Sequence, residues 1–145
     1  MALPHVAGKP RQIFLEPDAS VDFRIRTDAS VWRDFVHVEV YRHHPMEHRF
    51  KQKIAGYVAY ASSPQHAALF HTKALKIALF CETEAAKTLL KGWTAQVLTQ
   101  LGQEEEGERF FFRSIDLSSV SPSDLYLSPD WQQAFGETTT PLFML

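Results

Sequence analysis

VWRDFVHVEVYR, residues 31–42, is the stretch that decides the fold. β-Branched and aromatic residues dominate it over a length that suits a buried strand, so we expect a strand at the centre of a sheet. Alternation divides its second half between two faces, with Val36, Val38 and Val40 on one and His37, Glu39 and Tyr41 on the other.

Beyond this stretch, the chain alternates between apolar runs typical of strands and segments whose apolar residues recur at helical spacing. We expect strands at 12–18, 21–26, 31–42, 73–83 and 109–117, and helices at 46–62 and 84–102. Because a parallel crossover needs a helix to return the chain, this β-β-β-α-β-α-β order predicts an α/β fold with a mixed central β-sheet flanked by helices. We expect a flexible lead-in at 1–11 and a single domain at 12–145, in which 118–145 forms loops and short helical turns.

Composition limits the classes of function. The chain has 145 residues, 45% of them hydrophobic, which is enough for one buried core. A net charge of −2 gives no overall positive field, so any contact with DNA requires a local basic patch. Cys81 is the single cysteine, and no stretch approaches the roughly 20 apolar residues of a membrane span. We therefore expect a cytoplasmic protein without a membrane anchor.

Glu39 interrupts the apolar run FVHVEVY. A carboxylate that is buried without a partner costs several kcal/mol, so a buried Glu39 requires a cationic partner, an opening to water or a metal ion. A strand can also carry an acidic residue on a solvated face. The pattern alone leaves both interpretations open.

Three short motifs carry a family resemblance: PDA at 17–19, EVYR at 39–42, and Lys53 with Tyr57 in the following helix. With the later strands and LSPDW at 127–131, they resemble the replication-relaxation family of the PD-(D/E)XK nuclease-like superfamily. The resemblance implies a restriction-endonuclease-like core. It also implies a DNA-associated domain of a plasmid or mobile-element protein, with a winged-helix domain upstream.

By the same resemblance, Asp18 and Glu39 would bind Mg²⁺ or Mn²⁺, with the Val40 carbonyl as a third ligand. Tyr41 stands where the superfamily has its catalytic lysine, and Lys53 is the candidate replacement. Asp18, Glu39 and Lys53 are thus the catalytic candidates for phosphodiester hydrolysis. The alternative is a non-catalytic module for dimerisation or protein binding, in which Arg42 or Lys53 neutralises Glu39.

Other candidates come from the residues around this strand. Arg42, Arg49 and Lys51 lie in the densest basic stretch and are the predicted DNA contacts, although a solvated helix face is an equal alternative. Asp22 is a secondary candidate for a metal ligand. The histidines near the strand end, His37, His43, His44 and His48, lack the spacing of a zinc site, so loop histidines and a packed His37 are favoured. Cys81 is expected in the core.

Overall fold

The computed structural model describes residues 2–3, 11–12, 17–26, 28–43, 45–116 and 118–143. A six-stranded sheet has the order β3-β4-β5-β6-β7-β8. Its strands are β3 Ala19–Arg26, β4 Val31–Tyr41, β5 Lys76–Cys81, β6 Phe110–Ser114, β7 Trp131–Gln133 and β8 Thr139–Thr140. A separate ladder pairs β1 Ala2–Leu3 with β2 Arg11–Gln12. The helices are α1 Glu47–Ser62, α2 Gln65–Phe70, α3 Glu84–Leu101 and α4 Pro122–Leu127.

The sheet is mixed, as predicted. β3 and β4 form an antiparallel hairpin, β4, β5 and β6 run parallel, and β7 and β8 are antiparallel additions. α1 and α2 return the chain from β4 to β5, and α3 returns it from β5 to β6. The α/β class with a mixed sheet between helices is therefore confirmed, with β4 inside the sheet rather than at its edge.

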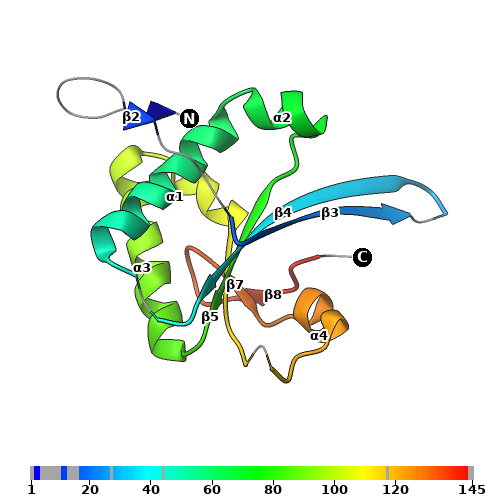
Figure 1. Ribbon diagram of the computed structural model, residues 1–145. Coiled ribbons are helices and arrows are strands. Elements are labelled where there is room, and N and C mark those ends of the chain that lie inside the picture. Colours follow the sequence, from blue (N-terminus) through cyan, green and yellow to red (C-terminus); the bar gives the residue numbers. More distant parts are fainter. Residues whose placement is uncertain are drawn as a thin grey trace.

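Both long helices cover the same face of the sheet, as Figure 1 shows. The two crossovers step in the same direction between neighbouring parallel strands, so crossovers of one hand place α1 and α3 side by side. Phe50, Ile54 and Tyr57 of α1 and Leu90 and Leu98 of α3 are at most 2% exposed in this layer. Every second residue of β5 faces them, beginning with Ile77 and Leu79.

The opposite face has a smaller core under α4 and the C-terminal segment. Its buried members are Val36, Ala78, Phe80, Phe111, Trp131, Leu142 and Phe143. The alternation of valines predicted for β4 is therefore present, with Val36, Val38 and Val40 on this side. The His37–Glu39–Tyr41 face lies under α1, so it is not a solvated face.

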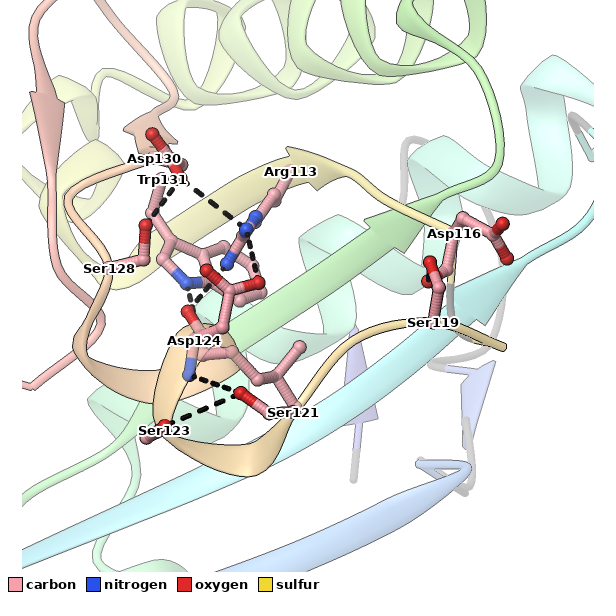
Figure 2. Close-up of polar contacts among 10 residues, drawn as sticks. Arg113, Asp116, Ser119, Ser121, Ser123, Asp124, Ser128, Asp130 and Trp131 are labelled. Atoms are coloured by element: carbon pink, nitrogen blue, oxygen red, sulfur yellow. Dashed lines mark hydrogen bonds and ion pairs between the residues drawn. The ribbon is translucent and has the colours of Figure 1, made fainter.

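Arg113 of β6 fastens α4 to this face. It is 7% exposed and donates to the Asp124 carbonyl at 2.9 Å, to Asp124 Oδ2 at 3.2 Å and to Asp130 Oδ2 at 3.4 Å. Figure 2 shows its guanidinium reaching both aspartates, while the Trp131 indole donates to the Leu125 carbonyl at 2.8 Å. A buried arginine and a buried tryptophan thus satisfy their donors on one short helix.

The C-terminal part differs from the expectation of loops and helical turns alone. α4 is such a turn, but β7 and β8 extend the sheet. They are three and two residues long, too short to show a period, and pairing with the preceding strand rather than local pattern makes them strands. The acidic run near Glu104 forms a 3₁₀ helix, Glu104–Arg109, instead of a loop.

Both ends of α3 are capped. Thr83 Oγ1 accepts the Ala86 N–H at 3.1 Å, and Gly102 ends the helix with φ of 65°, a left-handed conformation that glycine adopts at little cost. Residues 1 and 4–10 of the predicted lead-in and residues 13–16 of the first predicted strand lie outside the described residues.

Candidate functional site

The open end of the β3–β4 hairpin brings Asp18 beside the end of β4. The register pairs Ala19 with Val38, so the residue before β3 lies level with Glu39. Asp18 is exposed, and its Oδ2 accepts the Val40 N–H at 2.7 Å. Two acidic residues that are far apart in sequence therefore lie close together, Asp18 just before β3 and Glu39 near the end of β4.

Glu39 is buried under α1, with 2% of its surface exposed. Lys53 Nζ donates to Glu39 Oε2 at 2.8 Å, and Tyr57 Oη donates to Glu39 Oε1 at 2.5 Å. Lys53 and Tyr57 are four residues apart on α1, so they are neighbours on one helix face. Both oxygens of the buried carboxylate thus have a donor.

Burial sets the electrostatics of this site. It raises the pKa of Glu39, and the nearby charge of Asp18 acts in the same direction, while the hydrogen bonds from Lys53 and Tyr57 oppose the rise. The pKa of Tyr57 is also raised, by burial and by the Glu39 charge, so Tyr57 is a neutral donor. The site combines two acidic residues, one ammonium group and one phenol.

Tyr41 adds no charge to the site around Glu39. It packs against Phe50 of α1, with ring centroids 5.7 Å apart. Burial and the charge of Glu39 raise the pKa of Tyr41, which keeps its hydroxyl neutral. The positive charge beside Glu39 comes from Lys53 and not from the position two residues beyond it in the strand.

The predicted DNA contacts do not share one surface. Arg42 is exposed at the end of β4, and Arg49 is exposed on α1, one turn before Lys53. Lys51 turns the other way: its Nζ donates to Gln96 Oε1 of α3 at 2.7 Å and lies 3.7 Å from Glu47 Oε2. Residues two apart on a helix point in nearly opposite directions, which separates Lys51 from Lys53.

The secondary candidates have other partners. The Asp22 carboxylate accepts two hydrogen bonds from Arg33, at 2.8 and 2.7 Å, so it pairs along the hairpin instead of joining Glu39. Across the described ranges, which omit His44, no three His, Cys, Asp or Glu residues are grouped closely enough to hold a metal ion. Cys81 is buried, and burial raises the pKa of its thiol to about 12.

His37 is a packed histidine. It is 8% exposed, its Nδ1 lies 2.7 Å from Ser20 Oγ, and the rings of Phe35 and Tyr57 contact it. Burial, together with His66, lowers the pKa of His37 to about 4. A neutral imidazole therefore occupies this place at pH 7.

A cavity of about 510 Å³ lies at the carboxyl ends of β4, β5 and β6, where Val40, the residue after Glu39, is part of its lining. Tyr41 and Arg42 line one side of it, and Glu82, Asp116 and Ser118 line the others. This edge is where open α/β sheets bind ligands. Glu82 and Asp116 were not singled out from the sequence, although Glu82 directly follows β5 and Asp116 lies two residues beyond the end of β6.

The donor set fits one magnesium-like ion. Such ions bind proteins through one or two carboxylates and keep several waters, and Asp18 and Glu39 supply two carboxylates. Asp18 is exposed and Glu39 is enclosed, so an ion would approach from the Asp18 side. Glu39 would have to share oxygens that already accept from Lys53 and Tyr57.

No protein-family model, curated protein or solved structure matches this chain. The described residues include no helix with both the length and the apolar character needed to cross a bilayer.

Proposed function

We propose that this chain is a DNA-associated nuclease-fold domain of a replication-relaxation-type protein of a plasmid or mobile element. The observation that supports this function is the convergence of Asp18, Glu39 and Lys53 at the end of one hairpin; Asp18 directly precedes β3, and the other two lie in β4 and α1. The family resemblance of the sequence names the same three residues. An upstream winged-helix domain in the cytoplasmic protein would add DNA affinity to a chain whose own net charge is −2.

The proposed activity is divalent-metal-dependent hydrolysis of a phosphodiester. Asp18 and Glu39 would hold Mg²⁺ or Mn²⁺, with the Val40 carbonyl as a third ligand. When bound, such an ion lowers the pKa of a water molecule and offsets charge on the phosphate. Lys53 supplies the positive charge that neutral Tyr41 cannot, and Tyr57 holds the Glu39 carboxylate in place.

Relaxation of supercoiled plasmid with Mg²⁺ or Mn²⁺ tests this activity. We expect nicking by the wild type and a loss of about 100-fold or more for Glu39→Gln and for Lys53→Met. Lys73→Met is the control, because Lys73 is exposed and lies outside the site. Plasmid that stays supercoiled with folded wild-type protein in either metal would contradict the catalytic proposal.

A second candidate is a non-catalytic module that keeps the fold for dimerisation, DNA docking or protein binding. The enclosure of Glu39 favours it, because Lys53 and Tyr57 already satisfy both carboxylate oxygens. DNA binding without nicking would support this candidate. Light scattering would show whether the chain forms a homodimer.

A further inference from the structure

The β3–β4 hairpin extends beyond the rest of the sheet. β4 pairs with β5 only from Val36 onward, so residues 31–35 have β3 as their one strand partner among the described residues. The last anchors to the body are Phe23, whose ring lies 4.3 Å from that of Phe143, and Asp34, which pairs with Lys76 at 2.6 Å. Beyond them, residues 24–26 and 28–33, here called the arm, stand out from the body in Figure 1.

One face of the arm carries three arginines. The register places Arg24 opposite Arg33 and Arg26 opposite Val31, and residues directly opposite each other share a face. Arg24 and Arg26 are exposed, and within the described part of the chain neither forms an ion pair. Arg33 is partly neutralised by Asp22 at 2.7 Å.

This arrangement is costly for the free protein. Like charges directly opposite each other in an antiparallel ladder are destabilising, and Arg24 faces Arg33 in this way. Three of the eight arginines of the chain lie on this one face, although the net charge of the whole chain is −2. A polyanion bound along the arm would remove the repulsion.

We propose that the arm binds duplex DNA by lying in the major groove with Arg24 and Arg26 against the backbone or guanine edges. The B-form major groove is about 12 Å wide and admits a two-stranded ribbon, and arginine is the side chain that best matches phosphate and guanine acceptors. The inference rests on the proposed association with DNA and adds a surface distinct from the Asp18–Glu39–Lys53 site. Six residues of β4 separate Arg33 from Glu39, a span of about 20 Å, so one duplex could contact both.

Fluorescence anisotropy with a short labelled DNA duplex, at several salt concentrations, tests the arm. The variant Arg24→Ala/Arg26→Ala removes both free charges. Thr88→Glu/Gln100→Glu is its matched control, because it reaches the same net charge through two exposed positions on α3. Arg24→Lys/Arg26→Lys keeps the charge on the arm.

If the arm contacts phosphates, the alanine variant binds more weakly and its slope of log K against log salt falls by about two. The control and the lysine variant keep the wild-type slope. An A-form RNA duplex, whose major groove is deep and narrow, binds the wild type more weakly than DNA. An alanine slope equal to wild type, a control slope reduced as much, or equal binding of the RNA duplex would overturn the proposal.

These outcomes separate the arm from the proposed function. If the wild type and the alanine variant bind DNA equally well, the arm is not the DNA-binding surface. The proposal of a DNA-associated domain is then unaffected. If the wild type binds no duplex, the proposed association with DNA is itself wrong. If nicking is lost while DNA binding is unchanged, the result bears only on the proposed role of the Asp18–Glu39–Lys53 site.

Discussion

At the scale of single residues, Glu39 is buried in surroundings that disfavour its ionised form. Burial raises its pKa, and hydrogen bonds from Lys53 and Tyr57 recover part of that cost. A residue chosen for stability alone at this position would be apolar, since buried ion pairs are often no better than apolar packing. The position of Glu39 is therefore best explained by a function for its charge.

Replacement of Glu39 by glutamine tests this cost. The folded protein binds the Glu39 proton more tightly than the unfolded chain does, so wild-type stability falls as pH rises from the ordinary value of 4.5 through the raised pKa. Glutamine has no charge at any pH and still accepts from Tyr57. We expect urea unfolding to show Glu39→Gln gaining stability relative to wild type as pH rises through this window. If the stability of the variant relative to the wild type instead falls as pH rises, the raised pKa of Glu39 is contradicted.

His37 gives the opposite pH dependence. Its pKa is about 4 in the folded protein and 6.5 when unperturbed, so the unfolded chain binds more protons between these values. Stability from the neutral ring is complete above pH 6.5 and is lost as pH falls toward 4, by up to about 3 kcal/mol. We expect His37→Phe to flatten the stability profile in this range, and NMR titration of the wild-type ring to give a midpoint near 4. A midpoint near 6.5 would disprove the effect of burial.

The sequence predicts only part of this residue-level picture. A charge inside FVHVEVY singled out Glu39, and the family resemblance added Lys53 as a candidate near it. Tyr57 was named only as part of a motif and not as a donor to Glu39, and Arg42, the other candidate partner, lines the cavity at the strand ends instead. The side of the sheet that α1 covers decides which side chains meet Glu39, and helical spacing does not contain that information.

At the scale of elements, α3 depends on its N-cap. The Thr83 hydroxyl accepts the Ala86 N–H, one of the amide groups that the first turn of a helix leaves without a partner. We expect Thr83→Ala to lower the free energy of unfolding by about 1 kcal/mol in urea. Thr88→Ala, within the same helix and exposed, should leave stability unchanged or slightly higher. Equal losses in both variants would show that the cap has no special role.

α4 depends on Arg113 instead of on its own length. With six residues it is too short to be stable alone, and the guanidinium ties it to β6 through the carbonyl and the carboxylate of Asp124, while Asp130, beyond the helix, also accepts from it. We expect Arg113→Met to cost about 2 kcal/mol and to change the fluorescence of Trp131, which bonds to the same helix. Arg49→Met, at an exposed position, is the control. A change below about 0.5 kcal/mol would mean that α4 is held by its apolar contacts alone.

Predictability differed between the elements for a physical reason. β5 is a continuous apolar run and α3 has a long helical period, and the structure places both within the ranges expected from the sequence, 73–83 and 84–102. β7 and β8 have two or three residues each, and their extended shape comes from pairing with a strand already in place. Short edge strands of this kind depend on tertiary contacts that a sequence window does not contain.

At the scale of the whole molecule, one hairpin links two proposed roles. Its open end holds Asp18 beside Glu39, and its far end carries the arginine face of the arm. Strand order predicted the mixed α/β sheet, but not that both long helices cover one face or that the hairpin projects from it. The side that the helices cover depends on the direction and hand of the two crossovers, and the projection of the hairpin depends on where β5 begins relative to β4, at Val36 opposite Lys76.

The central claim is that Asp18 and Glu39 form a divalent-metal site, and titration calorimetry with Mn²⁺ and Mg²⁺ tests it most directly. The account predicts binding of one ion by the wild type, lost in Asp18→Asn and in Glu39→Gln, and retained in Asp28→Asn, whose exposed side chain lies at the tip of the arm. No heat of binding from folded wild-type protein, or binding that survives both substitutions at the site, would contradict it.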